Sequence, residues 1–233
     1  MERRREHWGS KLGFILAAAG SAIGLGSLWR FPYLSGSNGG GAFVLLYLIF
    51  TIAIGVPLFI AELVVGRRAQ KSAALAYPLL ANGSSGWRLL GYLNIITALL
   101  IASFYCVVSG WCLSYTFMSL TQFSVGKSPE AVRNVFSTLA SSGDISLFWL
   151  FLFVLLNVGV VYSGVRKGIE HWSKMLTPAL LIILLGLFAF SMTLSGFSEA
   201  VHFVLMPDFS ALSPGGVLQA LGMACFTLSV GIG

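Results

Sequence analysis

The sequence predicts an all-α integral membrane protein, and two observations lead to this prediction. Of the 233 residues, 57% are hydrophobic and only 9% are charged, whereas a soluble domain carries roughly a quarter charged residues. Apolar runs of about 20 residues, the length of a membrane-spanning helix, recur along the chain. The expected spans are Leu12–Leu34, Gly41–Val65, Leu89–Leu120, Ile145–Val161, Trp172–Ser195 and a final run from Val217.

Basic residues are concentrated on one side of these spans. With a cytoplasmic N-terminus, three of the 14 Lys and Arg residues face outside, namely Arg30, Lys127 and Arg133. The other eleven face the cytoplasm: Arg3, Arg4, Arg5, Lys11, Arg67, Arg68, Lys71, Arg88, Arg166, Lys167 and Lys174. By the positive-inside rule, this asymmetry predicts a multi-pass protein of the cell membrane with its N-terminus in the cytoplasm. It also explains the net charge of +6, so we expect no nucleic-acid binding.

Four segments between the spans are expected to be loops. Arg67–Trp87 and Ser163–Trp172 would lie inside, whereas Thr121–Asp144 and Gly196–Pro214 would lie outside. Pro214 suits the first turn of the following helix, where its missing N–H is not needed. The opening residues are too polar for a signal peptide.

The whole chain, 1–233, is expected to form one transmembrane domain, because no linker interrupts the series of spans. The last span stops at Gly233, where a terminal carboxylate inside the bilayer would be costly. We therefore expect the sequence to be the front part of a longer protein. Three cysteines lie in apolar segments and are interpreted as reduced packing residues: Cys106, Cys112 and Cys225.

The first span contains helix breakers in "SAIGLGSLWRFP", Ser21–Pro32. One interpretation is close helix packing, because Gly20 and Gly24 form a G-x-x-x-G face. The other is a broken helix that ends near Ala22 and restarts near Leu25. Such a break turns carbonyls toward a cation and the N–H groups of the second half toward an anion.

A second interruption favours the broken helix. "FTLSVGIG", Phe226–Gly233, again places small and hydroxyl residues inside an apolar run, where Thr227 and Ser229 could cap or coordinate. Two interrupted helices five spans apart are typical of an inverted repeat, with binding sites at corresponding positions.

Several motifs resemble the neurotransmitter:sodium symporter family. "REHWGSKLGFILAAAGSAIGLGSLWRFPYLSGSNGGGAF" is similar to the family's first helix and following loop. Further matches are "VPLFIAELVVGRRAQ", "RKGIEHWSKMLTPAL" and "FTLSVGIG". The resemblance implies a LeuT-like broken-helix transporter fold, of which this chain would hold the first five transmembrane helices and the outer half of the sixth.

The resemblance also implies two sodium ions. The first would bind the carbonyl of Ala22 and the side chains of Ser27 and Thr227. The second would bind the carbonyls of Gly20 and Ile23. The family usually has Asn where this chain has Ser27, and a hydroxyl reaches less far than an amide oxygen.

A substrate site is implied in the same way. The N–H groups of Leu25 and Gly26 and the hydroxyl of Tyr105 would bind a carboxylate, although Tyr105 could instead belong to an interfacial aromatic belt. Carbonyls for the substrate amine would lie at Ala22, Phe226, Thr227 and Ser229. Apolar walls would come from Ile101, Phe226 and Ile232.

Gly24 indicates the substrate class. Relatives that transport monoamines carry Asp at this position, a counter-charge for an amine that lacks a carboxylate. The glycine here leaves room for a substrate with its own carboxylate, so a neutral amino acid is expected.

Gates are implied on both sides of the substrate. Arg30 would close the outside with Phe226 as a lid, or it could simply snorkel toward external water. Trp8 and Arg5 resemble the internal gate, and Arg5 fits the positive-inside pattern equally well.

Two further positions bear on the partner of Glu62 and on chloride binding. Glu62 could accept hydrogen bonds from the unwound backbone, as in relatives, or could pair with Arg67 or Arg68. Tyr47 matches a chloride ligand of chloride-dependent members, but Met223 replaces their Gln, and a thioether is a poor anion donor. We therefore do not expect chloride dependence.

The leading hypothesis is sodium-coupled symport of a neutral amino acid by alternating access. A membrane-embedded enzyme is not expected, because H-E-x-x-H and G-x-S-x-G are absent from the sequence. The remaining alternative is a non-transporting fragment or a split-gene subunit, with a second chain supplying the missing helices.

Overall fold

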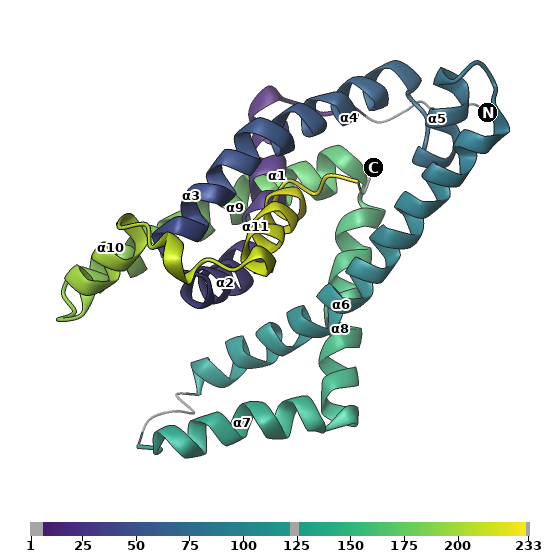
Figure 1. The fold of residues 1–233 in the computed structure, drawn as a ribbon. Coiled ribbons are helices and arrows are strands. Elements are labelled where there is room, and N and C mark those ends of the chain that lie inside the picture. The colour runs from purple at the N-terminus through teal and green to yellow at the C-terminus, as the bar shows by residue number, and fades with distance from the viewer. Residues whose placement is uncertain (1–6, 122–125, 232–233) are drawn as a thin grey trace. The chain divides into compact units, whose positions relative to one another are not determined.

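The computed structural model describes residues 7–121 and 126–231, and nearly all named elements in these ranges are helices (Figure 1). Within them, four helical segments are long and apolar enough to cross a membrane: Gly41–Ala69, Ser85–Leu120, Gly143–Tyr162 and Val165–Ser191. The bent pair Lys11–Ala22 and Gly26–Ser37 makes up to a fifth. The predicted series of five spans is therefore confirmed.

The chain divides into two compact units, which are described separately. The larger unit contains His7–Ile95 and Glu170–Gly233, and the smaller contains Ile96–Ile169. Helix α6 (Arg88–Leu120) runs from the first into the second. The expectation of a single domain stays a prediction.

The larger unit holds both predicted interruptions. Its helices are α1 (Lys11–Ala22), α2 (Phe31–Ser37), α3 (Gly41–Phe50), α4 (Val56–Ala69), α5 (Ala73–Leu80), α9 (Glu170–Ser191), α10 (Phe197–Leu205) and α11 (Pro214–Thr227). Short π-helical turns join some of them, at Gly26–Arg30 before α2 and at Thr51–Gly55 before α4. Pro57 follows the second of these turns and has no N–H for the helix ladder, which is one recognised cause of such irregularity.

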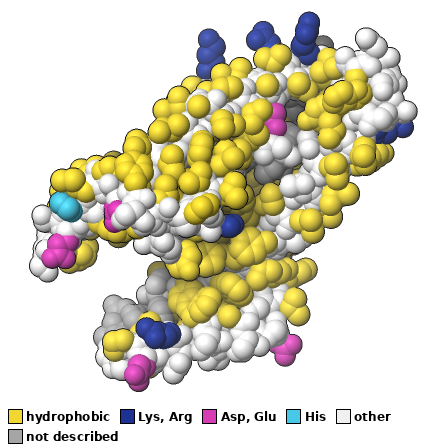
Figure 2. All heavy atoms as spheres, in the orientation of Figure 1, with side chains coloured by type: hydrophobic (Ala, Val, Ile, Leu, Met, Phe, Trp, Pro, Cys, Tyr) yellow, Lys and Arg dark blue, Asp and Glu magenta, His cyan; other side chains and the backbone are white. Residues whose placement is uncertain are grey.

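The core of the larger unit lies where α11 packs against α2 and α3. Leu34, Phe43, Ala220 and Met223 are buried there. Partly buried side chains surround them: Phe31, Leu46, Tyr47, Phe50 and Phe226. Many other large apolar side chains are exposed, and Figure 2 shows them spread over the visible face with few charged groups between them. This is the surface expected of helices whose solvent is lipid.

Helix α1 lies against α9 in the same unit. A Cβ added at Gly20 would stand 2.6 Å from Oγ1 of Thr177, whose hydroxyl donates to the carbonyl of Leu16 at 3.1 Å. Gly20 therefore does serve helix packing, as the first interpretation proposed. The interruption follows it, so both interpretations of the glycine-rich stretch hold in part.

The smaller unit is a helical hairpin with an extra helix. It contains the later part of α6, α7 (Pro129–Ser141), α8 (Gly143–Tyr162) and a π-helical turn at Val165–Ile169. Close approach at Gly110 puts α6 against the backbone of Leu150. The indole N–H of Trp111 donates to Oγ of Ser146 at 3.1 Å. These contacts hold α6 and α8 together.

The expectation that the connecting segments are plain loops is wrong. α5 lies inside Arg67–Trp87, α7 inside Thr121–Asp144 and α10 inside Gly196–Pro214, while Ser163–Trp172 is helical from Val165 onward. The helices α5, α7 and α10 are too short to register as spans, but α7 carries a recognisable start signal. There, Oγ of Ser128 caps the N–H of Ala131 at 3.2 Å, with Pro129 and Glu130 in the first turn.

The connection between α10 and α11 packs on the loop before α3. Gly40 and Pro207 form an isolated β-bridge, and the carbonyl of Asp208 lies against Gly39. Hydrogen bonds from the hydroxyl and N–H of Ser210 lower the pKa of Asp208. α11 then begins at Pro214, as predicted, and Oγ of Ser213 accepts from the N–H of Gly216 at 3.0 Å.

Candidate functional site

The first span is broken where the sequence predicted. α1 ends at Ala22, and its cap residue Ile23 donates its N–H to the carbonyl of Ala19 at 2.9 Å. The next helical bonds run from the N–H groups of Ser27 and Leu28 to the carbonyl of Gly24, each at 3.1 Å. The two helical parts meet at 44°. Leu25 and Gly26 therefore stand at a helix start, where N–H groups lack intrahelical partners.

Two of the predicted sodium ligands meet across this break. Oγ of Ser27 donates to the carbonyl of Ala22 at 2.7 Å. A cation between them would take the place of this hydrogen bond, because both oxygens have lone pairs to offer. Although it is short, the side chain of Ser27, which lies after the break, reaches the carbonyl of Ala22 at the end of α1.

The sixth helix is interrupted in the same unit. α11 ends at Thr227, and the chain then turns through Ser229 (φ 55°) and Gly231 (φ 85°). The N–H of Gly231 donates to Oε1 of Glu62 at 2.7 Å. The hypothesis that Glu62 receives the unwound backbone is therefore confirmed, and no ion pair of Glu62 with Arg67 or Arg68 is found among the described residues.

The two interruptions come together at Gly26. A Cβ there would lie 2.5 Å from the ring of Phe226, so the glycine permits close approach of the two segments. Next to Phe226, Oγ1 of Thr227 is buried and has no hydrogen-bond partner within 7–121 and 126–231. An unsatisfied buried hydroxyl costs about 1–3 kcal/mol. A bound cation would satisfy it, so the donor set fits sodium.

A groove of about 340 Å³ adjoins this junction. It is lined by Arg30, Leu34, Leu218, Gln219, Gly222, Met223 and Phe226. The predicted outer-gate residues Arg30 and Phe226 thus share one groove. Nδ2 of Asn38 donates to Oε1 of Gln219 at 3.0 Å and to the carbonyl of Leu34 at 2.9 Å. This buried amide ties the end of α2 to α11 behind the groove.

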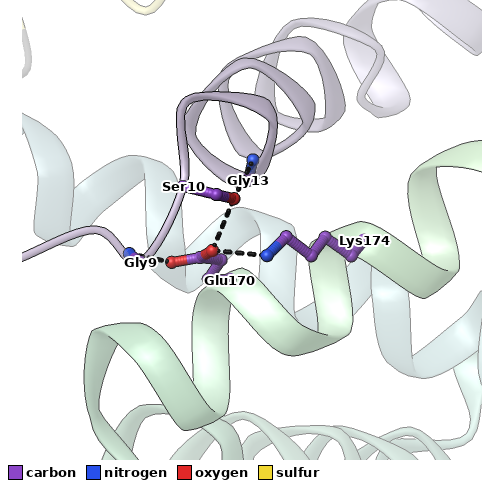
Figure 3. Close-up of polar contacts among 5 residues, drawn as sticks. All are labelled: Gly9, Ser10, Gly13, Glu170 and Lys174. Carbon is purple, nitrogen blue, oxygen red and sulfur yellow. Dashed lines mark hydrogen bonds and ion pairs between the residues drawn. The ribbon is translucent and has the colours of Figure 1, made fainter.

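At the other end of α1, a buried carboxylate was missed by sequence reasoning. Glu170 is 2% exposed and accepts from the N–H of Gly9 at 2.5 Å, from Oγ of Ser10 at 2.9 Å and from Nζ of Lys174 at 2.6 Å (Figure 3). Oγ of Ser10 in turn caps the N–H of Gly13 at 3.0 Å. An acid four residues before a lysine was the available signal. Its partner, the α1 start, could not be found without the fold.

Some predicted residues lie elsewhere. Trp8 is 40% exposed and packs edge-on against Phe14, with ring centroids 5.5 Å apart. Ile101 and Tyr105 are on the part of α6 that belongs to the smaller unit, so their role at this site stays a prediction. Arg5 and Ile232 lie outside the described residues.

Comparisons with known proteins agree with this geometry. The model of the sodium:neurotransmitter symporter family matches residues 5–130 and 129–233. The chain belongs to this family, whose members are transporters rather than enzymes.

The chain spans about half the length of some similar proteins and about a third of others. An uncharacterized sodium-dependent transporter, YhdH of Bacillus subtilis, is 42% identical over 99% of this chain and 51% of its own length. The rat sodium-dependent neutral amino acid transporter B(0)AT2 is 30% identical over 100% of this chain and 36% of its own. The crystal structure of MhsT in complex with L-phenylalanine has 44% identity and a TM-score of 0.89, covering 98% of this chain and 52% of that one. This likeness shows the predicted LeuT-like fold.

Proposed function

We propose that the protein couples the entry of a neutral amino acid to sodium, by alternating access, across the cytoplasmic membrane. Its N-terminus would lie in the cytoplasm. The family supports sodium dependence. Because the chain spans about half the length of the relatives it matches, the complete site would also need residues beyond the matched half, from the same polypeptide or a second chain.

The observation that supports this proposal most directly is the junction of the two interruptions. Gly26 lies against Phe226, with the Ser27–Ala22 oxygen pair on one segment and the unpartnered hydroxyl of Thr227 on the other. Gly20, Ala22, Ile23, Ser27 and Thr227 would then hold sodium. Oxygen donors are the ligands that hard cations prefer.

The substrate class follows from the charges around the junction. The start of the restarted helix offers N–H groups and a positive dipole end to a carboxylate. Carbonyl oxygens at the end of α11 would accept hydrogen bonds from the ammonium group of the same substrate. Position 24 is glycine and supplies no counter-charge. The rat relative is a neutral amino acid transporter by name, and the MhsT structure contains L-phenylalanine.

The proposal predicts sodium-dependent uptake. Proteoliposomes containing the protein with whatever half completes it should accumulate L-phenylalanine in a sodium gradient, and replacement of sodium by potassium should abolish the accumulation. Uptake would be measured with radiolabelled amino acid, and protein-free liposomes serve as the control.

Undiminished uptake in potassium would refute the coupling. Uptake of a monoamine in preference to the amino acid would refute the substrate class, because it would show that no substrate carboxylate is needed at the helix start.

A further inference from the structure

The backbone of Gly231 is held at both its N–H and its carbonyl, which belong to two successive peptide groups, and only one of the two contacts was expected from the sequence. Its N–H donates to Glu62 at 2.7 Å. Its carbonyl accepts from Nδ2 of Asn94 on α6 at 3.1 Å, when the Asn94 amide is oriented as its neighbours require. In that orientation the same nitrogen also donates to the carbonyl of Leu90 at 3.2 Å.

The neighbours of Asn94 decide its orientation. Two carbonyl oxygens face one end of the amide, and these can only accept, so the nitrogen belongs there. The amide oxygen then faces the hydroxyl of Tyr77 and accepts from it at 3.0 Å. The hydroxyl of Tyr77, both ends of the Asn94 amide, the N–H and carbonyl of Gly231 and Oε1 of Glu62 then all have partners.

Tyr77 is in place because α5 is packed tightly on α6. A Cβ at Gly91 would stand 2.5 Å from Cα of Ala74 and 2.5 Å from the carbonyl oxygen of Ala73. Gly91 and Asn94 are three residues apart and share one face of α6. Contact at Gly91 therefore brings Tyr77, one turn further along α5, to Asn94.

We propose that Asn94 and Tyr77 are positioning residues that complete a clamp on the interrupted segment after Thr227. Glu62 holds the N–H of Gly231 and Asn94 holds its carbonyl, while Tyr77 fixes the Asn94 amide. These two atoms belong to the successive peptide groups on either side of the Gly231 Cα, so the two contacts together restrict φ and ψ of Gly231. The carbonyls just before it, from Phe226 to Ser229, are thereby fixed in direction.

The backbone leaves the helical conformation before Gly231, which gives such a clamp a role. The φ values of Gly231 (85°) and Ser229 (55°) lie outside the helical region. Backbone bonds still tie the turn to α11 as far as Val230, whose N–H donates to the carbonyl of Cys225 at 3.0 Å, whereas the N–H of Gly231 donates to Glu62 instead. The importance of these carbonyls rests on the proposed function, in which they receive the substrate amine. The clamp itself does not depend on transport.

Hydrogen–deuterium exchange of the 233-residue chain in lipid nanodiscs tests the clamp. Asn94→Leu should raise the exchange rate of the peptide containing 228–231 by roughly tenfold, as expected for the loss of a hydrogen bond. Tyr77→Phe should raise it by less, about two- to threefold. Tyr77→Phe added to Asn94→Leu should change nothing further, because Tyr77 acts only through Asn94.

Asn157→Leu is the matched control. Nδ2 of Asn157 donates to the carbonyl of Phe153, one turn back on α8, so this variant removes the same local bond without a long-range partner. Its exchange at 228–231 should equal that of the unaltered chain. If Asn94→Leu unfolds the chain, as faster exchange throughout α3 would show, Tyr77→Phe decides.

Unchanged exchange at 228–231 in Asn94→Leu would overturn the clamp. An additive effect of Tyr77→Phe in the Asn94→Leu background would overturn the assigned role of Tyr77. Absence of sodium-dependent uptake by the unaltered protein would instead refute the proposed function and leave the exchange results standing.

Discussion

At the scale of single residues, the candidate cation site contains three oxygens. Two of them, on Ser27 and Ala22, are hydrogen-bonded to each other, and the third, on Thr227, has no partner among the described residues. The first two lie 2.7 Å apart, and the hydroxyl of Thr227 is buried. The unpartnered hydroxyl lowers stability until a ligand binds. Function and stability should therefore respond in opposite directions when it is removed.

Thr227→Val tests this expectation. The isosteric change should leave thermal stability in sodium-free buffer equal or higher by up to about 1 kcal/mol. It should lower sodium affinity by roughly tenfold, equivalent to about 1.4 kcal/mol. Sodium titration of amino-acid binding measures the affinity. A destabilised variant with unchanged sodium affinity would show that the hydroxyl is structural.

Ser27 allows a graded comparison at the same site. Ser27→Ala should weaken sodium affinity, because it removes a ligand oxygen, whereas Ser27→Asn should keep or improve it, because the amide oxygen reaches further. The same sodium titration distinguishes them. Equal sodium dependence in all three proteins would place the ligand elsewhere.

At the scale of elements, α1 is attached to α9 at its start and along its length. Glu170 holds the N–H of Gly9 and the hydroxyl of Ser10. A Cβ at Gly13 would collide with the Glu170 side chain. The hydroxyl of Ser10 both caps the N–H of Gly13 and donates to Glu170. The N-cap of α1 and the packing of α1 on α9 therefore depend on each other.

Gly13→Ala tests that coupling. The added methyl should displace Glu170 and lower the thermal unfolding temperature in detergent, at a cost of about 1–3 kcal/mol. Gly186→Ala on α9 is the matched control, since nothing lies within 4 Å of its added Cβ. It should be neutral or stabilising by up to about 1 kcal/mol. Equal effects of the two variants would refute the docking role of Gly13.

At the scale of the whole molecule, the orientation in the membrane remains a prediction based on charge. Single cysteines at Ser84 and Ser213 should react with a membrane-impermeant maleimide from opposite sides. In right-side-out vesicles we expect labelling of Ser213→Cys alone, and in inverted vesicles labelling of Ser84→Cys alone. The unaltered chain, whose three cysteines lie in apolar segments, gives the background. The reverse pattern would invert the topology.

The sequence predicted the spans and both interruptions, and it offered the Glu62 contact with the unwound backbone as one of two alternatives. The spans and the interruptions are local features, because apolar length and helix breakers can be recognised without the fold. It predicted the connecting segments poorly. α5, α7 and α10 have 8, 13 and 9 residues and are too short for a hydropathy signal.

The sequence by itself determined the class of protein, since helices that satisfy their own backbone in lipid require apolar runs of about 20 residues, and such runs are visible along the chain. Only the tertiary structure decided which residues meet. Glu170 and the start of α1 are 160 residues apart, and Asn94, Tyr77 and Gly231 come from three different elements. Such contacts depend on how the helices pack. Close approach at Gly20, Gly26 and Gly91 sets the distances between neighbouring segments, and these distances cannot be read from residue spacing along the chain.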